Sequence, residues 1–580
     1  YIRDTSPYID NFSKKSILFE KAIAAWPKTV PGLGSILTGK YGSTIHMMYA
    51  TFDPFYNESA SLPEILNENG YSTFAFVTNG NLQIDKGWSR GFDEYYESWK
   101  TFNRSRAHNV NAYAIDYLNR NKKGKFFVWL HYIDPHVPYR AFEDEFKAKF
   151  VNDSHYDKIF YDLDRKRNIP LTIEPWLTHG INDIPKSAAE DNITDVAYYI
   201  SQYDGEISYT DKYVGLMLQY LSENGLLNNT IVVFTVDHGE ALGDHDWYFD
   251  HGRYAYDDCS QIPLLMYIPG VDSRNISYPV SGIDITPTLL DLIGVQTNAD
   301  FEGMSLKPVI SGEKEYVSEY VYNEAGYNRD YQRTVRDSQY TLLYTPFIQE
   351  KDYMTDTFEL YDFRDSFQTK NIILERPDEA EKLKKVLFAW MKENQPPLRG
   401  YTLIDGYKSA LTADFEFPEI DVSGNKFYGK VESKNVDFDV CYTLPVPNPD
   451  AEIVLEALEA NTVDKPFQAD WSQKWDDKKL NRPCVGDSWG CLRINGEKIN
   501  NLPYAVRIQE ISSRTSDGYV SLYSDGGNKT FCFKSSTLNK RAEETDLGYV
   551  IEFMGHVNDV SNEEMDERTH QELINLGYID

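Results

Sequence analysis

The chain has 580 residues, more than one ordinary domain holds, and its 41% hydrophobic content favours a folded core over a disordered polymer. The formal net charge of −32 argues against nucleic acid as a partner, because a phosphate backbone repels an acidic protein. The sequence shows no apolar run of membrane-spanning length and no signal peptide.

The first two-fifths of the chain alternate helix and strand patterns. Residues 61–71 are typical of a helix, and the continuous apolar runs at 72–78 and 125–132 predict strands buried on both faces. Helical spacing of apolar residues over 203–221 leads into an apolar, β-branched run at 230–236. This alternation predicts an α/β fold, in which helices cover both faces of a mostly parallel central sheet.

Side chains that bind metals or protons come directly after two of these strands. The strand at 230–236 ends at Asp237 and His238, the start of a stretch of metal-capable residues, "DHGEALGDHDWYFDHG". The strand at 125–132 ends in "HYIDPHVPY", which contains Asp134 and His136. Ligand sites in parallel sheets lie beyond the carboxyl ends of the strands, so we expect both groups to meet at one edge.

Beyond a boundary at 395–401 the chain changes character. Short alternating segments at 519–524, 529–535 and 548–553 predict β-hairpins, with Asp-Gly-Gly joining the first two. Ser561 with Glu564 then resembles a capping box that opens a final helix. The sequence therefore predicts an added β-rich C-terminal module and, after it, a helix.

Thr29 lies in "WPKTVPGLGSILTG", where the segment after Pro31 and Gly32 looks like the start of a helix. A hydroxyl at a helix N-terminus faces free backbone N–H groups, which favour a bound anion. A purely structural N-cap is the alternative interpretation of Thr29 taken alone.

Motifs in order along the chain resemble the sulfatases of the alkaline phosphatase superfamily. They are "TVPGLGSILTG", "HYIDPHVPY", "VDHGEALGDH", "FDHG", "QIPLLMYIPG", "DITPTLLDLIGV", "FEGMSLKPVISG", "ELYDF" and "ELINLGYID". The resemblance implies a catalytic core at 1–310, a smaller subdomain at 311–400, an inserted β-rich module at 401–555, and a terminal helix at 556–580 that packs back on the core.

The resemblance also implies a nucleophile beside a divalent metal ion. In sulfatases the nucleophile motif is Cys-x-Pro-Ser-Arg, with Leu-Thr-Gly three residues later, and the Cys becomes formylglycine. Counting back from "LTG" places Thr29 at the Cys, and Gly32 and Leu33 at the Ser and Arg. Asp250 stands where many sulfatases carry a Lys. Members with Thr at the nucleophile position are similar to phosphodiesterases and to lipid phosphoglycerol or phosphoethanolamine transferases, so phosphate esters are favoured over sulfate esters.

The resemblance assigns roles to the remaining residues. Asp237, His238 and Thr29 are expected to hold one divalent ion (Ca, Mg, Mn or Zn), which would lower the pKa of the Thr29 hydroxyl. His136 and His251 are expected to protonate the leaving oxygen or to bind the non-bridging oxygens. The expected auxiliary residues are His131 as a support, Glu240 behind the metal, His245 and Asp244 outside the ligand set, and Asp284 as an N-cap.

Family members open with a buried strand that ends in one or two Asp, usually further metal ligands. The segment "YIRDTSPYIDNF" matches only the part of the family sequence that lies after this strand. We therefore expect one of two arrangements. Either residues upstream of Tyr1 fill the slot, or the sheet closes with the strand at 72–78 or 230–236 moved into the gap, which leaves the metal site incomplete.

The sequence leaves two functions open. The first is a metal-dependent hydrolase or transferase that acts on a small-molecule, glycan or lipid ester. The second is a non-catalytic extracellular structural or surface protein that keeps the sulfatase fold. The retained "DHGE", "DPH" and "FDHG" favour the enzyme. N-x-S/T sequons indicate a secreted glycoprotein, at the cell surface or outside the cell, and lie at Asn11, Asn57, Asn103, Asn152, Asn192, Asn228, Asn275 and Asn528.

Overall fold

The computed structural model describes residues 3–393 with short gaps, the backbone of the strands between 426 and 556, and Arg568. The gaps are 46, 48–54, 56–58, 103–104, 141, 152, 154–165, 172–179, 327–331, 346–356 and 366. None of the helices formed by these residues is both long enough and apolar enough to cross a membrane.

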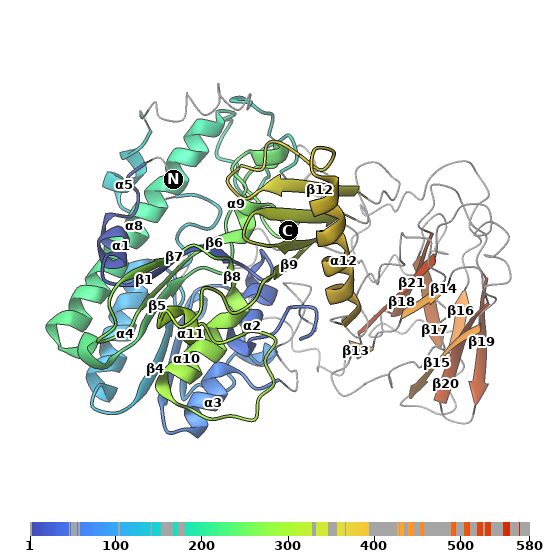
Figure 1. Ribbon diagram of the computed structural model, residues 1–580, viewed down its shortest axis with the longest axis horizontal. Helices are drawn as coiled ribbons and strands as arrows, with labels where there is room; N and C mark the ends of the chain where they lie inside the picture. The colour runs from blue at the N-terminus through green and yellow to red at the C-terminus, as the bar shows by residue number, and fades with distance from the viewer. Residues whose placement is uncertain are drawn as a thin grey trace.

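Two sheets form the centre of the core (Figure 1). The first has the order β5-β6-β1-β7, with β8 also paired to β1, and the second has the order β3-β2-β4. Their bounds are β1 Ile17–Ile23, β2 Ser72–Val77, β3 Glu94–Glu97, β4 Phe126–Leu130, β5 Val232–Thr235, β6 Gln261–Tyr267, β7 Arg274–Ile276 and β8 Val280–Ser281. Among these strands β6 is antiparallel to both neighbours, and the other pairs are parallel. The predicted mostly parallel α/β sheet is confirmed.

Helices cover both faces of the sheets (Figure 1). One face carries α2 Thr29–Thr38, α3 Leu62–Glu68, α10 Ile285–Ile293 and α11 Lys307–Ile310. The other carries α1 Pro7–Ser13, α4 Ala107–Asn121, α5 Asp144–Ala148 and α8 Val196–Glu223. Strand β2 shows why both faces are apolar: Phe74 and Phe76 pack against α4, whereas Ala75 and Val77 pack against α2. Alternate side chains of a strand point to opposite faces.

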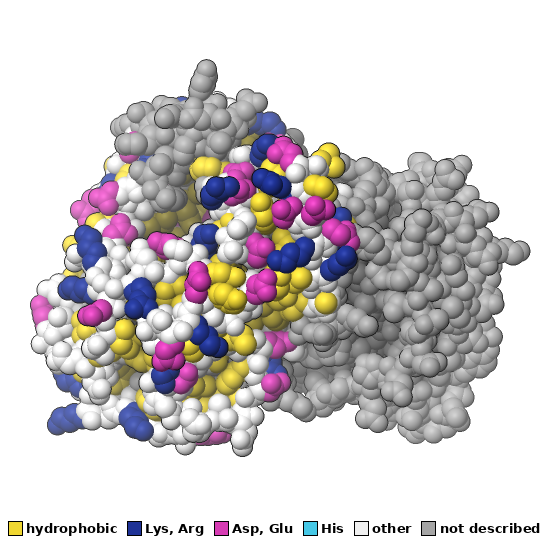
Figure 2. Space-filling model, viewed as in Figure 1, with side chains coloured by type: hydrophobic (Ala, Val, Ile, Leu, Met, Phe, Trp, Pro, Cys, Tyr) yellow, Lys and Arg dark blue, Asp and Glu magenta, His cyan; other side chains and the backbone are white. Residues whose placement is uncertain are grey.

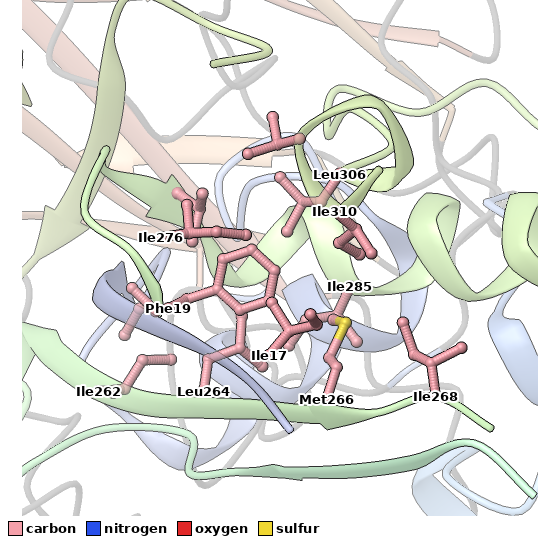
Figure 3. Packing of buried hydrophobic residues seen from close by; sticks show 14 residues of the cluster. Ile17, Phe19, Ile262, Leu264, Met266, Ile268, Ile276, Ile285, Leu306 and Ile310 are labelled. Atoms are coloured by element: carbon pink, nitrogen blue, oxygen red, sulfur yellow. The ribbon is translucent and has the colours of Figure 1, made fainter. Parts of the chain in front are cut away.

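A large core cluster lies between the first sheet and its helices. Figure 3 shows side chains from β1 and β6 pointing toward α10 and α11. Phe19 and Leu264 are buried in its centre, and Ile310 closes it from the helix side. Burial of each such side chain contributes about 1.5–3 kcal/mol. This packing fixes β1, and with it the loop that leaves β1 and carries Thr29.

Two strand edges are unpaired in the centre of the molecule. Among the described strands, none pairs with the second edge of β4 or with the second edge of β5. Both strands nevertheless lie under the same helices, because Val128 and Val232 pack against one cluster that includes Leu118 and Met217. The sheet has therefore not closed with β2 or β5 moved into the gap, and that expected arrangement is wrong for the described residues.

A third sheet, antiparallel throughout, comes after the core in the chain. It has the order β12-β11-β10-β9 and packs against α12. The bounds are β9 Val321–Ala325, β10 Gln332–Arg336, β11 Tyr340–Thr345, β12 Thr357–Asp362 and α12 Pro377–Glu393. The Glu324 N–H donates to Ala25 O at 2.9 Å, and the Gly326 N–H donates to Gly252 O at 2.7 Å. This sheet thus reaches the loops on which the candidate site is built.

The later strands form two further sheets, β13-β21-β18-β17-β16 with β14 on β21, and β15-β20-β19. They are β13 Lys426–Phe427, β14 Lys430–Ser433, β15 Asp439–Pro445, β16 Ile453–Glu456, β17 Trp489–Ile494, β18 Tyr504–Glu510, β19 Tyr519–Asp525, β20 Asn528–Lys534 and β21 Tyr549–His556. Asp525 pairs with Asn528, so the predicted Asp-Gly-Gly hairpin is confirmed. The predicted boundary at 395–401 and, apart from Arg568, the terminal helix lie outside the described residues.

Acidic and basic side chains are interspersed over the face of the core shown in Figure 2. The net charge of −32 is therefore not gathered into one acidic patch on that face.

Candidate active site

Thr29 sits on the first turn of α2, directly after the loop that leaves β1. Helix α2 begins at Thr29, six residues earlier than the sequence suggested, and Lys28 rather than Thr29 is the N-cap residue. Thr29 is 1% exposed, and its Oγ1 lies 3.5 Å from His238 Nε2. The structure therefore brings together the hydroxyl and the strand-end histidine that the family resemblance assigned to one metal site.

Gly32 explains one departure from the sulfatase motif. A Cβ added at this glycine would lie 2.9 Å from Trp26 O and 3.1 Å from Asp237 O. The Ser of the motif would therefore clash with the backbone next to Asp237. Leu33 at the Arg position is 7% exposed and packs in the apolar cluster around Val30 and Leu37, so this position faces the core.

Three histidines form one group above Thr29. The His238 and His251 rings stack with centroids 4.0 Å apart, and the His136 ring meets His251 edge-on at 5.2 Å. They come from three segments, the end of β5, the loop at 250–252 and the loop after β4. The predicted grouping of Thr29 and these histidines is what the structure shows, while their chemical roles remain predictions.

Each of these histidines has its Nδ1 next to an acceptor. His238 Nδ1 lies 2.7 Å from Gly239 O, His136 Nδ1 lies 2.8 Å from Val137 O, and His251 Nδ1 lies 3.1 Å from Glu240 Oε1. An N–H at Nδ1 that donates to such an acceptor leaves the lone pair on Nε2. In this tautomer Nε2 is the ring nitrogen that can accept a proton or bind a metal ion.

Burial sets the charge of the group. Burial lowers the pKa of His136 to about 3, with His251 adding to the effect, and it lowers the pKa of His251 well below its usual value. Burial raises the pKa of Glu240 to about 7. Burial also opposes ionisation of Asp237, but His238, His131 and His251 outweigh it, and the pKa of Asp237 is lowered. At neutral pH the site therefore holds an Asp237 carboxylate beside neutral His136 and His251.

The donor set fits part of a metal coordination shell. Asp237 Oδ2 and Thr29 Oγ1 each lie 3.5 Å from His238 Nε2. Two ligands about 2.2 Å from one ion and about 100° apart are separated by about 3.4 Å. No group of three or more His, Cys, Asp or Glu in the described part of the chain has metal-holding geometry. The set therefore depends on the Thr29 hydroxyl as its third member.

Three other residues of the sequence motifs lie beside the candidate site or away from it. His131 Nδ1 lies 2.7 Å from Thr78 Oγ1 at the end of β2, and burial lowers the pKa of His131 to about 4. Asp134 is fully buried and faces Arg106, 3.6 Å away, on the side of α4. His245 stacks on Tyr256 at 3.5 Å and is exposed.

Lys28 and Asp250 were not expected as a pair. Lys28 is 5% exposed, and Asp250 is the carboxylate whose charge acts on it. The Asp250 carboxylate also accepts the His251 N–H at 2.8 Å. In the sequence, the signal for this pair was the lysine directly before the nucleophile position. Its partner Asp250 lies in a loop far along the chain, so the pairing itself had no local signal.

Comparisons with known proteins identify the family of the chain. The family model "Sulfatase" matches residues 1–295, and the model "N-sulphoglucosamine sulphohydrolase, C-terminal" matches residues 243–395. The chain belongs to the sulfatase family. It is a hydrolase of that family, which decides against the non-catalytic alternative.

Individual relatives are distant. The chain is 26% identical over 380 residues to an ulvan-active sulfatase of Formosa agariphila. This alignment covers 58% of this chain and 67% of that protein. A solved structure bound to its substrate D-glucosamine-2-N,6-O-disulfate has a TM-score of 0.54 at 20% identity, covering 67% of this chain and 93% of that one. A phosphonate monoester hydrolase from Silicibacter pomeroyi has a TM-score of 0.51 at 18% identity, covering 69% and 92%. These structures confirm the sulfatase-like fold.

Proposed function

We propose that this sulfatase-family hydrolase cleaves phosphate esters in preference to sulfate esters, with Thr29 as the nucleophile. The observation that carries the proposal is the position of Thr29 Oγ1, on the first turn of α2 and 3.5 Å from His238 Nε2. Thr29 occupies the place of the motif Cys, and a Thr cannot supply the formylglycine on which sulfatases rely.

The single hydroxyl of Thr29 determines how the reaction must end. Attack by Thr29 Oγ1 forms an ester to phosphorus and breaks the bond to the leaving oxygen. Thr29 has no second hydroxyl to expel this ester, so water or an acceptor must then attack phosphorus itself. This chemistry supports a phosphorus centre, and the fold shared with a phosphonate monoester hydrolase is compatible with it.

Asp237, His238 and Thr29 would hold one divalent ion, which supplies positive charge to the hydroxyl and to the non-bridging oxygens. His251 stacks on His238, and His136 meets His251 edge-on. Both are neutral without substrate, and a bound anion would raise the pKa of either ring toward neutrality. Either can then donate a proton to the leaving oxygen.

The test is a paired assay on the full chain with Mg²⁺ or Ca²⁺, using an aryl phosphodiester and an aryl sulfate with the same leaving group. We expect faster phosphodiester cleavage, loss of at least about 100-fold in Thr29→Ala, and partial activity in Thr29→Ser. Thr297→Ala changes an exposed threonine outside the site and serves as the control. Sulfate release without phosphodiester cleavage would refute the phosphorus preference.

A second candidate is hydrolysis of a sulfate ester on a carbohydrate. The relatives that carry this activity in their names favour it, since one is ulvan-active and another binds a disulfated glucosamine. The same assay decides between the candidates. A covalent adduct on the Thr29 peptide after acid quenching, found with the phosphodiester only, would support the first.

A further inference from the structure

Lys28 places a buried ammonium group beside the nucleophile position. The residue precedes Thr29 and is 5% exposed. Its side chain runs along the loop at 250–252, because a Cβ added at Gly252 would lie 2.9 Å from Lys28 Cδ and 3.3 Å from Lys28 Cβ. Gly252 has φ +90°, so the glycine permits both the turn of this loop and the close approach of Lys28.

A buried ammonium group is unfavourable unless a carboxylate offsets it. Asp250 is that carboxylate. Burial lowers the pKa of Lys28 and raises the pKa of Asp250, and the charge of each residue opposes the shift of the other. Asp250 is held in place because it accepts the His251 N–H at 2.8 Å. The pair therefore joins the loop before Thr29 to the loop that carries His251.

The family motif positions supply no cationic side chain to the candidate site in this chain. Leu33 faces the core, Asp250 is acidic, and burial keeps His136 and His251 neutral. Lys28 directly precedes Thr29, and its side chain lies against Gly252, the residue after His251. The negative non-bridging oxygens of an ester at Thr29 would therefore have Lys28 as a cationic side chain between the nucleophile helix and the His251 loop.

We propose that Lys28 binds the non-bridging oxygens of the anionic ester, and that Asp250 is the counterion that holds Lys28 before the substrate arrives. This inference rests on the proposed function in one respect, that an anionic ester occupies the site at Thr29. In this proposal Lys28, the residue before the nucleophile, supplies the positive charge that other positions of the family motif lack in this chain. It further predicts that Asp250 and the substrate compete for Lys28.

The test measures anion binding apart from turnover. Inorganic phosphate is titrated calorimetrically into the full chain carrying Thr29→Ala, at fixed Mg²⁺, with and without Lys28→Met. We expect phosphate binding to weaken by about 10- to 100-fold, the effect of losing one charge-assisted hydrogen bond. Lys307→Met is the matched control, because Lys307 forms a lysine–aspartate pair with Asp291 at 2.8 Å on the surface.

The substitution Asp250→Asn is expected to change phosphate affinity in the opposite direction. The Asn side-chain oxygen can still accept the His251 N–H, but the competing negative charge is gone. We expect phosphate to bind several-fold more tightly, whereas a pair with only a structural role would leave binding unchanged in every folded variant. Weaker binding in Asp250→Asn would overturn the counterion role.

The double variant Lys28→Met/Asp250→Asn removes both charges and is used if Lys28→Met alone does not fold. The inference is overturned if Lys28→Met binds phosphate as tightly as the parent, or if the double variant binds it as tightly as Asp250→Asn alone. A parent chain that binds no phosphate also overturns it. A chain that binds phosphate through Lys28 but cleaves neither ester leaves the inference standing and rejects the proposed function instead.

Discussion

At the scale of single residues, Gly32 ties the nucleophile helix to the strand end that carries Asp237. The glycine lies against Trp26 O and Asp237 O with no space for a side chain. This contact brings the first turn of α2 close to the end of β5, which the short Thr29–His238 separation requires. The motif residue that sulfatases place here is therefore excluded by packing, independent of its chemistry.

We expect Gly32→Ser to lower the free energy of unfolding by about 1–3 kcal/mol, because the new Cβ overlaps two backbone oxygens. Ser is the better helix former by about 0.5 kcal/mol, so a net loss would identify the clash as the cause. Urea unfolding measures the change. Gly124→Ser is the control, since the nearest atom to its added Cβ is 3.9 Å away, and equal stability of both variants would contradict the packing argument.

Strand ends were the useful signal at the residue scale. His238 and His136 follow β5 and β4 and lie near Thr29 and His251, as expected, while the roles of these residues stay predictions. The pairing of Lys28 with Asp250 was not predictable, because it depends on how two loops far apart in the sequence pack against each other. Strand patterns carry no information about such loop contacts.

At the scale of elements, Asp284 joins β8, α10 Ile285–Ile293 and the loop at 304. The sequence predicted an N-cap of α10, and the residue occupies that position, but its side chain makes no cap hydrogen bond. It accepts instead the Ser281 N–H and the Met304 N–H, each at 2.8 Å. Burial raises the pKa of Asp284 to about 6.

This pKa predicts a pH-dependent loss of stability. The folded-state value of about 6 lies above the ordinary 3.8, so the folded protein binds more protons between these values. Stability should therefore decline as pH rises from about 4 to 6, by on the order of 2–3 kcal/mol. Urea unfolding across this range should show a flatter profile for Asp284→Asn. Asp272→Asn, on an exposed loop, should match the unmodified protein, and equal slopes in all three proteins would contradict the prediction.

Element positions were predicted well where periodicity was strong. The strand patterns at 72–78 and 125–132 correspond to β2 Ser72–Val77 and β4 Phe126–Leu130. The start of α2 was placed too late, because Pro31 and the glycines suggested a loop, whereas Pro is tolerated in a first helical turn. The antiparallel direction of β6 has no local signal, since buried strands of either direction are equally apolar.

At the scale of the whole molecule, we expect a divalent ion to stabilise the fold through Asp237, His238 and Thr29. A ligand at 100 times its dissociation constant adds about 2.7 kcal/mol of stability. Thermal unfolding in EDTA, and then with excess Mg²⁺, Ca²⁺, Mn²⁺ or Zn²⁺, measures the effect. Asp237→Asn should abolish the increase in Tm, and Asp246→Asn, in an exposed pair with Lys166 at 3.0 Å, should retain it. If the ion raises the Tm of Asp237→Asn as much as that of the unmodified protein, the ion binds at another site.

In the part of the chain that the structure describes, one edge of β4 and one edge of β5 have no partner strand, which has a consequence for solution behaviour. Each edge offers a row of N–H and C=O groups to any extended segment of matching direction. Any segment that covers these edges, from this chain or from a second copy, would pair beneath the helices α4 and α8 that cover both strands. Residues that cover these edges would therefore have two effects: they would complete the sheet and protect the protein against aggregation.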